Sequence, residues 1–170
     1  MKLKKEISIF FILGLFYLGI ELFSRAGRQE LVGLVLMSPK PIQPLSLAGW
    51  TSIWMLFVGG FAAWSVGFVD TFASFAKQKL IIKILVCGLI IAATEFFSGL
   101  VLNTYLELAL WDYSHVRYNL LGQITIRSAT AFTLLGPLVL WLNNFLRYKL
   151  FDEPKRYRFP GIYWDLIRGK

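Results

Sequence analysis

The chain contains 170 residues, of which 56% are hydrophobic and 16% are charged, and its formal net charge is +8. Soluble domains are about 45–50% apolar and about 25% charged, so this composition excludes an ordinary soluble enzyme and a disordered chain. The single cysteine, Cys87, excludes both an internal disulfide and a multi-thiolate metal site. Apolar runs long enough to cross a bilayer instead predict an integral membrane protein.

Four apolar segments predict an all-α bundle of four transmembrane helices. The first segment follows a basic stretch, as the core of a secretory signal peptide also would. It lacks a small-residue cleavage pattern, so we expect a retained helix. The predicted spans cover approximately residues 7–23, 46–69, 80–103 and 119–146 of a transmembrane domain over 1–146.

Two further segments are distinctive. Residues 31–37 are apolar but too short to span, and prolines follow them, so they predict a short re-entrant or interfacial segment. Residues 147–170 form a basic and aromatic tail. The tail fits an interfacial anchor on anionic lipid, and it also fits a docking surface for a partner protein.

The distribution of lysine and arginine predicts the orientation. With the N-terminus in the cytoplasm, twelve basic residues lie on the cytoplasmic side and four on the external side, while Lys83 and Arg127 lie within spans. Because cytoplasmic segments carry the excess of basic residues, we expect both termini to be cytoplasmic, in the plasma membrane of a bacterium. The same distribution accounts for the net charge, so the expected partners are membrane lipids and not nucleic acid.

Glu95 and Arg127 are predicted to lie deep within the third and fourth spans. Glu95 comes eight residues before the outer end of the third span at Asn103, and Arg127 comes eight residues after the start of the fourth at Asn119. A rise of about 1.5 Å per residue places both roughly 12 Å below the outer boundary, where opposite charges would pair. Gln123, one turn before Arg127, would extend a polar track toward the surface.

The Glu95–Arg127 pair has three possible roles. It could lock two helices together, close a ligand pocket, or form part of a proton or ion path. Gly88 and Gly99 lie on the same face of the third span as Glu95, and such small residues allow a neighbouring helix to approach closely.

The connection between these spans packs aromatic rings and hydrogen-bonding groups into a short stretch that begins at Trp111. It fits an interfacial aromatic belt with a turn, and it also fits a polar rim above the track. The candidate ligand-binding residues are Glu95, Arg127, Gln123, Asn119, Trp111, Asp112, Tyr113 and Ser114.

Three motifs carry a resemblance to a known family: Glu95–Gly99 (EFFSG), Trp111–Ser114 (WDYS) and Asn119–Ile124 (NLLGQI). Their order and spacing resemble those of the CmpB-like type IV ABC-transporter family of membrane proteins from Gram-positive bacteria. The resemblance implies a multi-pass membrane protein with a role in transport. Arg127 stands where that family is usually apolar, so the resemblance does not imply the Glu95–Arg127 pair.

Catalytic and metal-binding motifs are missing from the sequence. It contains no P-loop, so ATP hydrolysis would require a separate ATPase subunit. Its one histidine, His115, belongs to no cluster with metal-ligand spacing, and adjacent Asp112, Ser114 and His115 do not by themselves form a triad. We therefore expect no enzymatic activity, no metal and no cofactor.

Together these features predict a membrane component of a transport system that binds or passes a small polar solute near the outer leaflet. Four helices are few for a solute pore, so we expect a homo- or hetero-oligomer. One alternative is a non-transport assembly, sensor or regulatory subunit with a structural Glu95–Arg127 pair. A weaker one is a membrane enzyme that acts on lipid head groups.

Overall fold

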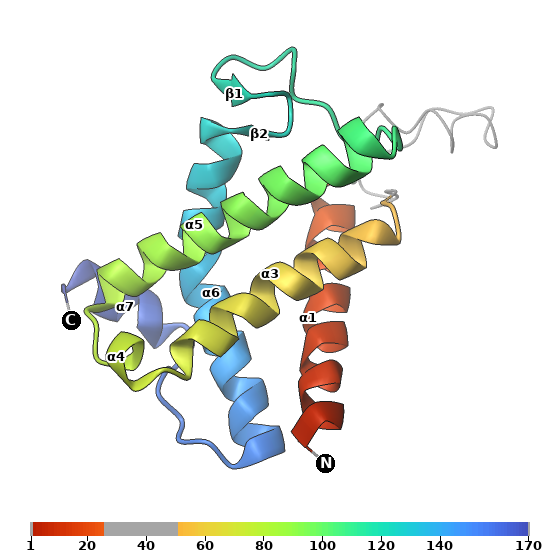
Figure 1. The fold of residues 1–170 in the computed structure, drawn as a ribbon. Helices are drawn as coiled ribbons and strands as arrows, with labels where there is room; N and C mark the ends of the chain where they lie inside the picture. The colour runs from red at the N-terminus through yellow and green to blue at the C-terminus, as the bar shows by residue number, and fades with distance from the viewer. Residues whose placement is uncertain (1, 26–50, 170) are drawn as a thin grey trace, which may run out of the picture.

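A computed structural model describes residues 2–25 and 51–169, and these residues are mostly helical (Figure 1). The predicted re-entrant segment at 31–37 lies outside the described residues. The helices are α1 (Lys2–Arg25), α3 (Trp54–Asp70), α4 (Ala73–Ala76), α5 (Leu80–Gly99), the π-helix η2 (Leu100–Tyr105), α6 (Ile126–Phe151) and α7 (Gly161–Ile167). Two short strands, β1 (Asn119–Leu120) and β2 (Ile124–Thr125), pair in antiparallel fashion.

Three helical segments are long and apolar enough to cross a membrane: Leu3–Phe23, Leu80–Tyr105 and Ile126–Phe151. Their mean hydropathies are 1.9, 2.3 and 1.4. They correspond to the first, third and fourth predicted spans. The second predicted span, 46–69, is represented among the described residues by the shorter apolar helix α3, which has 17 residues. The described residues thus contain three span-length helices and one shorter apolar helix.

The four main helices pack as two close antiparallel pairs, α1 with α3 and α5 with α6, and α3 also contacts α5 and α6 (Figure 1). Glycines at the crossings allow the close approach. A Cβ atom on Gly14 of α1 would lie 2.4 Å from the backbone oxygen of Leu56, and one on Gly88 of α5 would lie 2.1 Å from the Thr133 hydroxyl. Gly88 therefore faces the next span, as predicted, whereas Gly99 packs against Gln123, which precedes α6.

The start of the fourth span differs from the prediction. Residues 119–125 form a β-hairpin in which Leu121 and Gly122 have φ values of 50° and 70°, as in the turns that favour two-stranded hairpins. Helix α6 begins only at Ile126, after a capping box in which the Thr125 side chain accepts from the Ser128 amide at 3.0 Å. This cap ends the hairpin and begins the helix seven residues later than hydropathy suggested.

The start of α1 and the tail lie at the same end of the helix assembly, here called the tail end. The opposite end, where the 106–125 connection lies, is called the hairpin end (Figure 1). Helix α6 continues to Phe151, beyond the predicted end at 146, and the chain then folds back so that Ile162 of α7 is buried in the core. Which side of the membrane each end faces stays a prediction.

Candidate functional site

Glu95 is buried inside α5, with 6% of its surface exposed. Its Oε2 atom has no hydrogen-bond partner among the described residues. Glu21 of α1, itself buried, lies near enough to interact with Glu95 electrostatically, and the Thr51 hydroxyl donates a hydrogen bond to Glu21. Two buried carboxyl groups from different helices therefore lie in one region, and an oxygen of Glu95 has unused capacity to accept a hydrogen bond.

The predicted Glu95–Arg127 ion pair is wrong. Among the described residues no ion pair contains Glu95, and Arg127 is exposed. The predicted depth of Arg127 required a helix from residue 119, whereas α6 begins at Ile126. Arg127 therefore lies in the first turn of α6. A helix that began seven residues earlier would have placed it about 10 Å deeper.

Gln123 joins the hairpin to the end of α5, although it lies outside the helical stripe in which it was predicted. Its side-chain oxygen accepts from Asn103 Nδ2 at 3.0 Å, and its backbone oxygen accepts from the indole N–H of Trp111 at 3.0 Å. Asn103 in turn accepts from the Leu110 amide at 2.7 Å. Gln123 and Trp111 are both buried. These two predicted site residues therefore hold the hairpin on the helix pair.

The remaining polar residues of the 106–125 connection form hydrogen bonds within it. Asp112 accepts from the backbone amide of Ser114 at 2.8 Å and from its hydroxyl at 2.9 Å. These bonds, first the one from the backbone, hold the pKa of the exposed Asp112 carboxyl below its usual range. Asn119 donates to the Ser114 and Val116 carbonyls and accepts from the Gly122 amide at 2.8 Å. The half-buried Tyr113 packs in the cluster that contains Trp111.

Six of the eight predicted site residues lie in the 106–125 connection, which ends in the hairpin: Asn119, Gln123, Trp111, Asp112, Tyr113 and Ser114. It does not pair Arg127 with Glu95. Chemically, the hairpin end offers a buried carboxyl group on α5 beneath a hydrogen-bonded loop anchored to the same helix. Such an arrangement can accept hydrogen bonds from a polar or cationic group. Among the described residues no group of three or more potential ligands could hold a metal ion.

The tail end contains a polar network that the sequence did not predict. Asp70, at the end of α3, is buried and lies 3.5 Å from the ammonium of Lys83 and 3.2 Å from the guanidinium of Arg156. Lys83 donates to the Tyr157 hydroxyl at 2.8 Å, and that hydroxyl donates to Asp70 at 2.9 Å. Burial, together with the Asp70 charge, raises the pKa of Tyr157. Lys83, which the sequence placed within a span, is buried and ion-paired.

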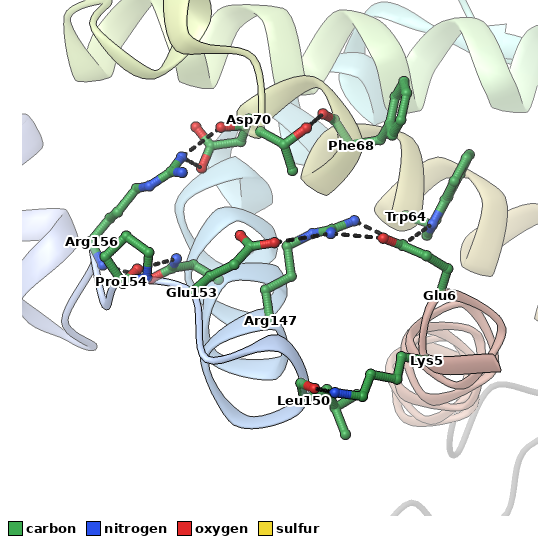
Figure 2. Close-up of polar contacts among 12 residues, drawn as sticks. Lys5, Glu6, Trp64, Phe68, Asp70, Arg147, Leu150, Glu153, Pro154 and Arg156 are labelled. Carbon is green, nitrogen blue, oxygen red and sulfur yellow. Dashed lines mark hydrogen bonds and ion pairs between the residues drawn. The ribbon is translucent and has the colours of Figure 1, made fainter. Parts of the chain in front are cut away.

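A second ion pair lies beside this network. Arg147 of α6 donates two hydrogen bonds to the Glu6 carboxylate of α1, and Trp64 of α3 donates a third at 2.9 Å (Figure 2). Glu153 lies 3.5 Å from the same guanidinium. Arg147 was predicted to be the first residue of the basic and aromatic tail, and it lies instead within α6. The only available signal was an acid near the start of one span and a base near the end of another, which does not specify a partner.

Comparison with known proteins adds a family. A family model described as "Putative ABC-transporter type IV" matches residues 45–160 of the chain. The matched segment runs from before α3 to the residue preceding α7, so it includes both the hairpin end and the tail-end network. Searches of the curated proteins and of the solved structures each found no match.

Proposed function

This chain belongs to the type IV ABC-transporter family that matches its residues 45–160, and we propose that it binds or passes a small polar solute as the membrane component of a transport system. The observation that carries this proposal is the buried carboxyl group of Glu95, one oxygen of which lacks a hydrogen-bond partner among the described residues. Ionisable residues inside a span are costly and mark substrate and ion pathways.

The site favours a solute that donates hydrogen bonds or carries positive charge. Glu95 and the nearby Glu21 are both acids, and an acid without a bonded donor gains most from a ligand that supplies one. We propose that this end of the molecule faces the outer leaflet of a bacterial plasma membrane, which the uneven distribution of basic residues supports. The alternative of a non-transport subunit was based on a structural Glu95–Arg127 pair, and that pair is not formed.

A solute screen with the purified protein in lipid nanodiscs tests the role of Glu95. The panel contains amino acids, polyamines and sugars, and the readout is the thermal-unfolding midpoint. We expect at least one cationic or donor-rich solute to raise the midpoint of the wild type and of the Glu107→Gln control, but not that of Glu95→Gln. Glu107 is an exposed acid of the same connection. A solute that stabilises Glu95→Gln as strongly as the wild type contradicts the proposal.

We further propose that an ATPase subunit and additional membrane chains complete the transporter. The sequence contains no P-loop, and the three span-length helices among the described residues are few for a solute pathway. Cross-linking in intact cells, followed by purification and mass spectrometry, should recover a P-loop protein at constant ratio to this chain. Recovery of this chain alone, at a cross-linking yield that captures a known membrane complex, overturns the ABC assignment.

We also propose that this chain is not itself an enzyme. In the 106–125 connection the Ser114 hydroxyl donates to Asp112 at 2.9 Å and not to an imidazole, which is not the order of a catalytic triad. Incubation of the purified chain with labelled phospholipids should give no product. Turnover that Asp112→Asn and His115→Ala both abolish would instead support the lipid-headgroup enzyme.

A further inference from the structure

A pocket of about 570 Å³ opens at the tail end, between the start of α5 and the returning tail. It lies at the opposite end of the molecule from Glu95 and plays no part in the proposed solute site. Its volume is within the range of about 300–1,000 Å³ that small-molecule sites occupy. Its charged lining consists of four bases and one acid: Lys77, Lys79, Lys83, Arg156 and Asp165.

The inner wall of this pocket is held in place by the tail-end network. Lys83 and Arg156 both bond to Asp70, and Tyr157 bonds to Lys83 and Asp70. Lys83 is only 5% exposed, so its ammonium cannot turn away into solvent. A ligand would meet these two cations already positioned, which reduces the entropic cost of binding.

The outer wall supplies cations that nothing in the described structure neutralises. Lys77 and Lys79 are exposed, and neither takes part in an ion pair among the described residues. The four bases of the lining face two carboxylates, those of Asp70 and Asp165, so the pocket keeps an excess of positive charge. In addition, α5 begins at the pocket with no side-chain cap and no acid in its first turn. The positive end of the helix dipole adds to the same field.

We propose that this pocket binds a phosphoryl group. Several ammonium groups and one guanidinium around a preformed cavity match an oxyanion that carries more than one negative charge. The phosphoryl group could belong to a lipid whose headgroup is a phosphate monoester, because the pocket adjoins the start of a span-length helix. It could equally belong to a soluble phosphorylated molecule. Both sources share the same recognition chemistry, and the experiment below separates them.

The first arm measures binding of inorganic pyrophosphate to the full chain in phosphatidylcholine nanodiscs. We expect the double variant Lys77→Gln/Lys79→Gln to bind at least about tenfold more weakly than the wild type, since two charge-assisted contacts are lost. The control Lys4→Gln/Lys149→Gln removes two other exposed lysines at the same end and should bind within about twofold of the wild type. The variant Lys77→Arg/Lys79→Arg should retain binding, because it keeps both charges.

The second arm measures retention of phosphatidic acid by native mass spectrometry after exchange from mixed phosphatidylcholine nanodiscs. If Lys77→Gln/Lys79→Gln abolishes the retention of phosphatidic acid and the control variant preserves it, the phosphoryl group belongs to a lipid headgroup. Sensitivity confined to pyrophosphate identifies a soluble ligand. Unchanged thermal-unfolding midpoints for both variants establish that the fold is intact, as expected for exposed side chains. The proposal is overturned if the pocket variant and the control bind both probes equally.

Discussion

The Glu6 carboxylate accepts two hydrogen bonds, at 3.0 and 2.9 Å, from the guanidinium of Arg147, which lies 141 residues further along the chain. This bidentate pair joins the start of α1 to the end of α6 (Figure 2). The Arg147 side chain is 5% exposed and that of Glu6 is 19% exposed, so water screens the pair only weakly. The first and last long helices are thus connected at the tail end by this ion pair and by the hydrogen bond that the Lys5 ammonium donates to the Leu150 carbonyl.

Removal of Arg147 should therefore destabilise the protein strongly. Breaking one half of a buried pair costs about 3–5 kcal/mol, so we expect Arg147→Ala to lower the free energy of unfolding by about 3 kcal/mol. Unfolding by SDS titration in mixed micelles provides the measurement. The exposed Arg168 serves as the matched control, and Arg168→Ala should change the value by less than about 0.5 kcal/mol. If Glu6→Ala and Arg147→Ala have simply additive effects, the two side chains are not coupled.

Two glycines of α1 offer a matched test of the α1–α3 contact. A Cβ on Gly14 would lie 2.4 Å from the backbone oxygen of Leu56, whereas one on Gly19 would meet nothing within 4 Å. A backbone atom cannot retreat as a flexible side chain can, so Gly14→Ala should destabilise the protein by about 1–3 kcal/mol. Gly19→Ala should be neutral or stabilising by up to about 1 kcal/mol, because alanine favours helix. Equal effects of the two substitutions on the unfolding midpoint would contradict the packing described for α1 and α3.

The hydrogen bonds of Asn103 should determine how rigidly the 106–125 connection is held. Asn103→Leu leaves the Leu110 amide and the Gln123 side-chain oxygen without their partner, at a cost of about 1–3 kcal/mol. We expect faster amide hydrogen exchange across residues 106–125 and little change in α1. The neighbouring Thr104 is exposed, and Thr104→Ala should leave exchange in the hairpin unaltered. Unchanged exchange in Asn103→Leu would mean that other contacts hold the hairpin.

The tail-end network should give the protein a characteristic loss of stability at high pH. The pKa of Tyr157 is raised, chiefly by burial and then by the Asp70 charge. In the unfolded chain this phenol ionises near pH 10, while in the folded chain it stays protonated. The unfolded state then binds fewer protons, so stability falls as the pH rises above about 10.

Substitution of this tyrosine should flatten that pH dependence. We expect Tyr157→Phe to lose less stability than the wild type between pH 9 and 11, although it starts from a lower value because two hydrogen bonds are missing. Unfolding midpoints measured across this range provide the comparison. Tyr148, which is exposed, is the control, and Tyr148→Phe should follow the wild-type profile. A wild-type profile for Tyr157→Phe would show that another group titrates.

The apolar character of α1, α5 and α6 was readable from the sequence by itself. Transfer of a segment from water to lipid depends on the sum of its side chains, so a local window of residues contains the needed information. The small residues Gly88 and Gly99 were also correctly assigned to a contact face, because helical periodicity places them on one side of α5. The family motifs likewise lie in contiguous stretches and could be compared directly.

Only the tertiary structure decided which charges meet. The start of α6 depends on a hairpin and a capping box that hydropathy does not detect. The helix therefore begins seven residues later than predicted, and Arg127 does not reach the depth of Glu95. Asp70 forms ion pairs with Lys83 of α5 and with Arg156 of the tail. Glu6 forms an ion pair with Arg147 near the end of α6. Such pairings depend on the rotation and crossing of every helix at once. Because those variables are set by all the packing contacts together, no local window of sequence contains them.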